Sequence, residues 1–193
     1  MNKPAHNHLR LKFCVSGAAE TGHCSTDALD KAKALGREIA TMGATLVNGA
    51  TTGFPYWAAI GAKEAGGMTI GISPAATEKE HRDFFNLPLD YLDVIIYTGA
   101  GMSGRNLLLT RSTDAVIVGC GRIGTLNEFT VAFEDKKPIG VLTNTGGTTD
   151  MIEQVIKESH RAKDNPFVVF SDDPKELIAK LVAILEREKV DEV

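Results

Sequence analysis

The stretch from Gly119 to Glu128, GCGRIGTLNE, combines residues that can bind a phosphate with residues that can do chemistry. Its three glycines spell G-x-G-x-x-G, the spacing of dinucleotide-binding loops. Glycines in such a loop let backbone N–H groups approach an anion, and the following helix N-terminus adds about half a positive charge. Gly121, Gly124 and Thr125 can therefore hold a single terminal phosphate.

Two other interpretations of this stretch compete with a phosphate site. A NAD(P) site places the fingerprint after the first strand and an acidic residue about 20 positions on. Here the fingerprint follows the fifth predicted strand, and the residue at that distance is Asn144, which argues against NAD(P). The structural alternative is a capping box, because Thr125 and Glu128 spell T-x-x-E at a helix start. The phosphate loop and the capped turn both remain open.

The elements that must position this stretch are short apolar runs alternating with helical patterns. Most runs are nearly continuous in Val, Ile and Leu, as expected for strands covered on both faces. The predicted strands span residues 11–17, 44–49, 68–73, 93–98, 114–119, 138–143 and 166–170. This alternation predicts an α/β fold: a single doubly wound Rossmann-like domain over residues 11–190, with about seven mostly parallel strands and helices on both faces. Residues 1–10 are predicted to be a flexible tail.

Ligands of such sheets bind beyond the carboxyl ends of the strands. Four segments of this chain are predicted to reach that edge: residues 16–22, 48–53, 98–105 and 119–128. Three of these four segments are rich in glycine. One long irregular segment, residues 74–92, is either a lid or a packed excursion.

Composition and charge narrow the class of protein. The 193 residues carry a net charge of −4 with both signs interspersed, which gives no footprint for duplex nucleic acid. The N-terminus has no apolar core for a signal peptide, and no apolar run approaches the roughly 20 residues that span a bilayer. We therefore expect a cytoplasmic protein with no nucleic-acid or membrane partner.

The cysteines and histidines suggest neither a disulfide framework nor a metal site. Cys14, Cys24 and Cys120 are odd in number and lack C-x-x-C spacing, which predicts reduced thiols in a cytosolic setting. His6 and His8 belong to the predicted polar tail. We expect no bound metal.

The segment MSGRNLLLTRSTDAVIVGCGRIGTLNEF resembles the Lonely Guy family, also called lysine-decarboxylase-like proteins. That family carries M-x-x-R-K, then a strand, then P-G-G-x-G-T-x-x-E. The upstream LVNGATTGFPYWAAIGAKEAGGMTIGISP resembles its second glycine loop, helix and third strand. The resemblance runs from about residue 11 to 145. Its paired R…GTxxE spacing is far more specific than the glycine fingerprint alone.

The resemblance implies hydrolysis of the N-glycosidic bond of nucleoside 5′-monophosphates, which releases base and ribose 5-phosphate. Positive charge develops on the sugar ring in such a reaction. The resemblance makes Glu128 the carboxylate that stabilises this charge or activates water, and Arg105 the residue that positions ribose or phosphate oxygens. The implied phosphate- and nucleotide-binding residues are Gly121, Arg122, Gly124, Thr125, Ser16, Gly17, Gly49, Gly53 and Asn106. No catalytic cofactor is implied. The base pocket is expected from residues 16–22, 74–91 and a partner subunit.

The sequence also departs from the family pattern. Cys120-Gly121-Arg122 replaces Pro-Gly-Gly, and Asn106 replaces the lysine after the motif arginine. The loop of residues 48–53 replaces a triple-glycine run. These features resemble a divergent branch that includes molybdenum cofactor carrier proteins, which hold a phosphate-bearing pterin without hydrolysing a nucleotide.

Three functions therefore compete, and all of them use a small phosphorylated ligand, either a nucleoside monophosphate or a pterin. We predict a phosphoribohydrolase, with a cofactor carrier or a nucleotide-sensing module as alternatives. The resemblance also implies a homo-oligomer, a dimer or larger, paired through helices that flank the cleft. Phe129, Val131 and Phe133 are either part of that interface or part of the core.

Overall fold

The computed structural model describes residues 9–161 and 166–191. The predicted tail therefore lies largely outside the described residues, as do His6 and His8. Among the described residues, no helix is long and apolar enough to cross a membrane.

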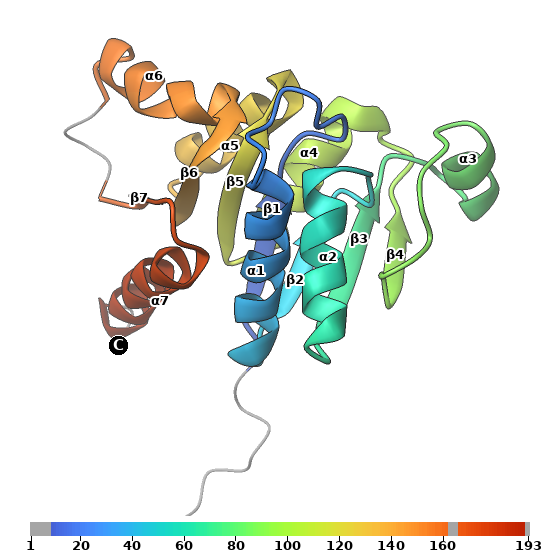
Figure 1. The fold of residues 1–193 in the computed structure, drawn as a ribbon, viewed down its shortest axis with the longest axis horizontal. Coiled ribbons are helices and arrows are strands. Elements are labelled where there is room, and N and C mark those ends of the chain that lie inside the picture. Colours follow the sequence, from blue (N-terminus) through green and yellow to red (C-terminus); the bar gives the residue numbers. More distant parts are fainter. Residues whose placement is uncertain (1–8, 162–165, 192–193) are drawn as a thin grey trace, which may run out of the picture.

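A seven-stranded sheet forms the centre of the molecule, in the order β4-β3-β2-β1-β5-β6-β7 (Figure 1). Every pairing between neighbouring strands of this sheet is parallel. The strands are β1 Lys12–Ser16, β2 Thr45–Asn48, β3 Met68–Ser73, β4 Val94–Tyr97, β5 Ala115–Gly121, β6 Ile139–Gly147 and β7 Val168–Ser171. The predicted α/β class and the seven parallel strands are confirmed.

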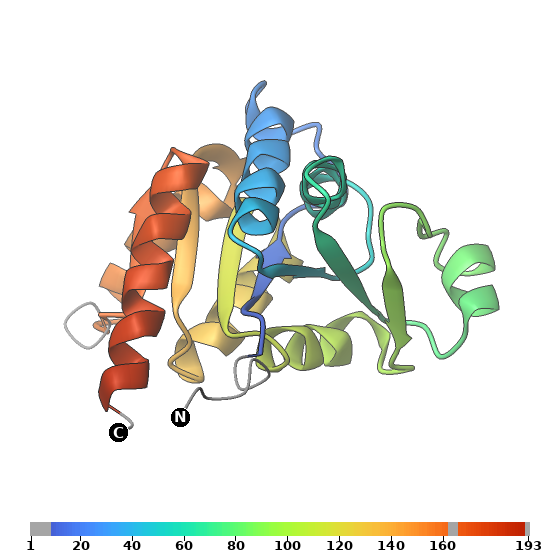
Figure 2. The ribbon, with the colours of Figure 1, turned by 90° about the horizontal axis from the view of Figure 1, so that it is seen from below.

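Helices cover both faces of the sheet (Figure 2). The helices are α1 Ala28–Thr41, α2 Phe54–Glu64, α3 Glu78–Asp83, α4 Gly101–Arg111, α5 Ile123–Glu134, α6 Ile152–Glu158 and α7 Pro174–Asp191, with a 3₁₀ turn, η1, at Thr148–Met151. One apolar cluster packs α1, α2 and α7 against one face. A second cluster packs α4, α5 and α6 against the other.

Strand β5 shows why continuous apolar runs form central strands. All seven of its residues are buried. Ile117 packs into the first cluster, whereas Val116 and Val118 pack into the second, as alternation along a strand requires. Phe129 and Phe133 of α5 also belong to the second cluster. These two phenylalanines are therefore core residues rather than an interface.

The strand order reverses between β1 and β5. Strand β2 lies on one side of β1 and β5 on the other, so the connections that follow β1 and β5 diverge to opposite sides of the sheet. A crevice opens at such a switch point beyond the carboxyl ends of the strands. Residues 74–92, by contrast, lie beside β4 at the end of the sheet (Figure 1). There the buried His81 lies 2.8 Å from Ser73 Oγ and 3.0 Å from the carbonyl of Pro88, so these contacts anchor the segment to the end of β3.

Candidate functional site

A cavity of about 370 Å³ lies at the switch point between β1 and β5. Small-molecule sites span roughly 300–1,000 Å³, so the cavity can take a ligand of nucleotide size. It is lined by Val15, Ser16, Gly17, Ala18, Ala19, Gly49, Thr51, Pro55, Met102, Arg105, Asn106, Leu109, Arg122, Ile123, Gly124, Thr125 and Glu128. Of the residues predicted from the sequence, Gly53 and Gly121 do not line it.

Arg105 and Glu128 form a buried ion pair against this cavity. Arg105 Nη1 donates to Glu128 Oε1 over 2.9 Å, and the two residues are 6% and 5% exposed. The hydroxyl of Ser16 donates to the other carboxylate oxygen. With its amide oriented to satisfy its neighbours, Asn106 also donates to Glu128 Oε1, at 2.8 Å. The four side chains, predicted as site residues from three distant segments, come together in one network.

The electrostatics of Glu128 are set by its burial. Loss of solvent raises the pKa of this carboxyl group above its ordinary value, while the charge of Arg105 and the hydrogen bond from Ser16 pull the pKa down.

Arg105 is tightly surrounded, because a Cβ on Gly49 would lie 2.1 Å from its Nη1. Its Nε is buried without a hydrogen-bond partner among the described residues. Gly49 thus makes room for the guanidinium group.

The loop from Arg122 to Thr125 starts helix α5. Arg122 is extended and immediately precedes the first helical residue, Ile123. Thr125 is the third residue of the helix, and its hydroxyl accepts the Arg122 N–H at 3.4 Å. The alternative in which Thr125 is the N-cap and Glu128 its capping partner is therefore wrong. Glu128 lies further into the helix, where its side chain serves the cavity.

The same helix start offers donors to a ligand. The first N–H groups of an α-helix have no intrahelical partner, and the helix dipole makes this end positive. A Cβ on Gly124 would meet no atom within 4 Å, so the backbone there is open to an approaching group. Gly121 has another role, since a Cβ on it would lie 2.5 Å from Thr148 Oγ1. It allows the turn to pack tightly behind the cavity.

Arg122 brings an exposed positive charge to the cavity wall. Its Nη1 pairs with Glu20 at 2.5 Å, and the two side chains are 55% and 81% exposed. Exposed ion pairs are worth about 0–1 kcal/mol. Arg122 can therefore leave Glu20 for an anionic ligand at little cost.

Gly17 and Gly53 hold two loops of the cavity wall close together. A Cβ on Gly17 would lie 2.6 Å from the carbonyl oxygen of Gly119. Gly53 has a φ of 74° and precedes α2, and a Cβ there would lie 2.1 Å from the carbonyl of Ala18. Both glycines shape the cavity, although only Gly17 lines it.

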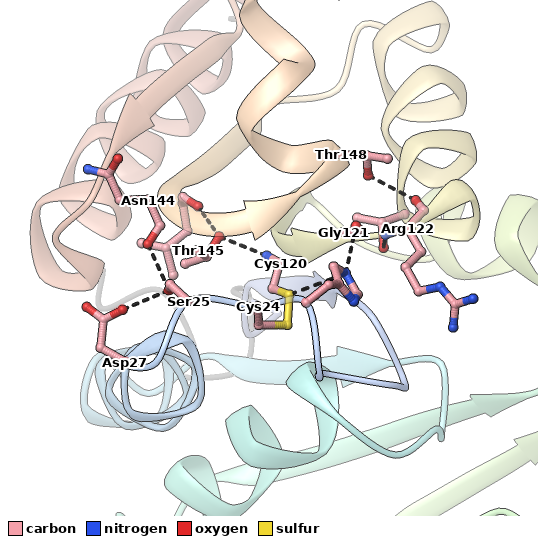
Figure 3. Close-up of a disulfide and its surroundings, with 12 residues drawn as sticks. Cys24, Ser25, Asp27, Cys120, Gly121, Arg122, Asn144, Thr145 and Thr148 are labelled. Atoms are coloured by element: carbon pink, nitrogen blue, oxygen red, sulfur yellow. Dashed lines mark hydrogen bonds between the residues drawn. A yellow bond between two sulfur atoms is a disulfide. The ribbon is translucent and has the colours of Figure 1, made fainter.

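The expectation of reduced cysteines is wrong for two of the three. Cys24 and Cys120 form a disulfide next to the loop that starts at Arg122, with a Cα–Cα distance of 5.4 Å (Figure 3). They are 96 residues apart, and they meet because the β1–α1 loop crosses the end of β5. Cys14 is free and buried.

Sequence reasoning also missed part of the wall and assigned another part wrongly. Met102, Thr51 and Ile123 line the cavity, and Ile123 is 76% exposed. All three stood inside segments compared with the family: Met102 opens M-x-x-R, Thr51 lies in the loop of residues 48–53, and Ile123 is the variable residue before G-T. Residues 74–91 were expected to supply the base pocket, but none of them lines the cavity, although the whole segment is described.

The fold and site together define a doubly wound α/β protein with a ligand cavity at its switch point. The chain belongs to the SLOG cluster4 family, whose model matches residues 10–178. A protein of Archaeoglobus fulgidus is 31% identical over 132 residues, which cover 68% of this chain and 82% of that protein. The resemblance to the Lonely Guy family, in the branch that includes molybdenum cofactor carriers, is confirmed.

Two solved structures are similar over nearly their full length. The molybdenum cofactor binding protein of Rippkaea orientalis has a TM-score of 0.74 and 29% identity, and the match covers 92% of this chain and 98% of that one. The Moco carrier protein of Chlamydomonas reinhardtii also has a TM-score of 0.74, with 27% identity over 93% of this chain and 99% of that one.

Proposed function

We propose that this protein carries a phosphorylated cofactor of the molybdenum-pterin class and does not hydrolyse it. The observation that carries this proposal is the state of Glu128. The residue is 5% exposed, and its carboxylate accepts hydrogen bonds from Arg105, Ser16 and the reoriented amide of Asn106. A general base must first lie within hydrogen-bond reach of the water that it activates. A carboxylate whose oxygens already accept hydrogen bonds from three side chains is poorly placed to bind such a water beside a sugar carbon.

The phosphate of the ligand binds at the start of α5 in this proposal. The open backbone at Gly124 and the helix N-terminus supply N–H donors and a positive dipole. Arg122 supplies a guanidinium group that can form two parallel hydrogen bonds to phosphate oxygens. The partner of Arg122 in the free protein, Glu20, is an exposed side chain, so Arg122 can turn to the phosphate.

The ring system of the ligand fits the rest of the wall. Val15, Pro55, Met102, Leu109 and Ile123 give the cavity a largely apolar lining. Flat heterocycles bind in cavities of this kind, where a few polar groups fix their orientation. The similarity to two proteins named for molybdenum cofactor binding favours a pterin over a nucleotide base.

Hydrolysis of a nucleoside 5′-monophosphate is the second candidate. It is favoured by the presence of Glu128 and Arg105 at one cavity and by the raised pKa of Glu128, because perturbed carboxyl groups in clefts are candidate acids or bases. In this case one of the three donors must release the carboxylate when substrate binds. Nucleotide sensing would use the same phosphate loop without requiring the carboxylate. A cytoplasmic location stays a prediction for all three functions.

One experiment separates these functions. The purified protein is incubated with AMP, GMP, CMP and UMP, and free base is measured by chromatography. A parallel sample is denatured, and any released pterin is detected by its fluorescence after oxidation. The carrier function predicts pterin and no free base. If the wild type releases free base and Glu128→Gln does not, the protein is a hydrolase and the carrier proposal is wrong. If the protein binds a nucleotide but yields neither free base nor pterin, the result favours a nucleotide sensor.

A further inference from the structure

Three metal-binding side chains meet beside the cavity, outside the network of Glu128. Cys24 and His23 come from the loop between β1 and α1, and Cys120 comes from the end of β5 (Figure 3 shows the two cysteines). Their sulfur atoms and a ring nitrogen of His23 all lie within 4.8 Å of one another. His23 Nε2 is 3.8 Å from Cys120 Sγ. No sequence motif announces this group, because the two cysteines are 96 residues apart along the chain.

We propose that the reduced protein binds a divalent cation of the zinc class through Cys24, Cys120 and His23. Two thiolates and an imidazole are a donor set that Zn²⁺ prefers, and soft sulfur ligands disfavour Mg²⁺ and Ca²⁺. Three protein ligands leave the fourth tetrahedral position open. His23 is exposed and Cys24 is half-buried, so the open position is accessible to water or to a ligand atom.

The backbone holds the two thiols together independently of the bond between them. The N–H of Cys120 donates to Thr145 Oγ1, and its carbonyl accepts from Ala18 N, both over 2.8 Å. The N–H of Ser25, next to Cys24, donates to the carbonyl of Thr145 over 3.0 Å. Because the loops after β1 and β5 and the end of β6 are joined by these bonds, both thiols stay at one corner when the disulfide is opened.

Disulfide formation and cation binding exclude each other in this proposal, because they use the same sulfur atoms. A dithiol reductant supplies two electrons and two protons, opens the Cys24–Cys120 bond and leaves as its own disulfide. The cation then displaces one proton from each thiol and binds both thiolates. Oxidation by dioxygen removes two electrons from the two thiolates, re-forms the disulfide and releases the cation, while the dioxygen takes up two protons and becomes hydrogen peroxide. The site is independent of the proposed carrier function.

Cobalt provides the test, because thiolate ligation gives Co²⁺ a charge-transfer absorption band. The protein is reduced with a phosphine, which takes up the oxygen of water as the disulfide becomes two thiols, and excess reductant is removed without air. Titration with Co²⁺ is expected to give the band at one ion per chain, and Zn²⁺ is expected to abolish it. The air-oxidised protein is expected to show no band.

Variants identify the ligands. Cys24→Ser, Cys120→Ser and His23→Ala are each expected to weaken binding by about tenfold or more, since even outer-sphere changes cost a metal site that much. Cys14→Ala is the matched cysteine control, and the double variant His6→Ala with His8→Ala controls for the histidines of the N-terminal segment. Both controls are expected to bind as the wild type does.

A measurement on the wild type alone covers the case in which a variant fails to fold. Zn²⁺ is expected to slow alkylation of Cys24 and Cys120 in the reduced protein, as followed by peptide mass spectrometry. The proposal is overturned if the reduced protein gives no charge-transfer band, if the oxidised protein binds equally well, or if Zn²⁺ leaves the alkylation rates unchanged.

Discussion

Arg105 and Glu128 pair where little solvent reaches either partner, since they are 6% and 5% exposed. A buried ion pair adds little net stability, but removal of one member leaves an uncompensated charge in a low-dielectric site. We expect Arg105→Met to lower the free energy of unfolding by about 3–5 kcal/mol. Arg111, which pairs with Asp135 over 2.9 Å and is 60% exposed, is the matched control. Arg111→Met should change stability by about 1 kcal/mol or less, as measured by urea denaturation. Equal losses in the two variants would contradict this role of burial.

The raised pKa of Glu128 predicts how stability changes with pH. Because burial lifts this pKa above 4.5, the folded protein holds the proton more tightly than the unfolded chain does. The unfolded state therefore binds fewer protons, and this group's contribution to stability falls as pH rises above 4.5.

Glu128→Gln isolates this contribution, since the other titrating groups are common to both proteins. We expect the unfolding free energy of the wild type, relative to Glu128→Gln, to decrease as pH is raised from 4.5. Urea denaturation at a series of pH values measures the difference. A difference that increases with pH would mean that Arg105 and Ser16, rather than burial, dominate the site.

At the scale of elements, a substitution at the start of α5 is expected to weaken ligand binding without changing the stability of the protein. A Cβ on Gly124 meets no atom, so Gly124→Ala is expected to keep the free energy of unfolding within about 1 kcal/mol of the wild type. The added methyl group occupies the approach to the helix N-terminus. We expect phosphate-bearing ligands to bind about tenfold more weakly, a change of about 1.4 kcal/mol. Calorimetric titration measures the affinity, and unchanged binding would place the phosphate elsewhere in the cavity.

The disulfide ties two elements that are distant in sequence. Closing a loop between Cys24 and Cys120, 96 residues apart, restricts the unfolded chain, and such cross-links typically contribute about 2–4 kcal/mol. We expect reduction in the absence of metal to lower the unfolding free energy by that amount. Cys14→Ala is the control: reduction should cost this variant the same amount, because the Cys14 thiol is not part of the bond. A reduced protein as stable as the oxidised one would show that the hydrogen bonds of Thr145 suffice to hold this corner.

Helices and strands could be predicted from the sequence where a single physical cause, such as burial on both faces, determines the residue pattern. Strand β5 is buried on both faces, and a short continuous apolar run between turn residues is typical of such a strand. The T-x-x-E pattern of Thr125 and Glu128 fits both a helix cap and a cavity carboxylate, and only the extended backbone of Arg122 decides where α5 begins. The disulfide depends on which loops the topology brings together. Local spacing carries no trace of that contact.

At the scale of the whole molecule, one edge of the sheet is left uncovered. Ile70 and Ile72 of β3 pack toward α4, and Val94 and Ile96 lie beside them in register on β4. Val94 and Ile96 therefore face the same side, yet they are 45% and 48% exposed. Leu108 of the neighbouring helix α4 is also 45% exposed. Single exposed apolar residues are ordinary, but several on adjoining elements are typical of an interface.

We therefore expect a homodimer that buries the exposed face of β4 together with α4. Light scattering at micromolar concentration should give a mass about twice the 20.7 kDa of the chain. Ile96→Lys combined with Leu108→Lys should give a monomer, because charges in a buried apolar contact have no partner. Met151→Lys is the matched control, since Met151 is 55% exposed on η1 and lies outside this face. A wild-type protein with the mass of one chain would contradict the dimer. If the variant with both lysines is still a dimer, the interface lies on another surface.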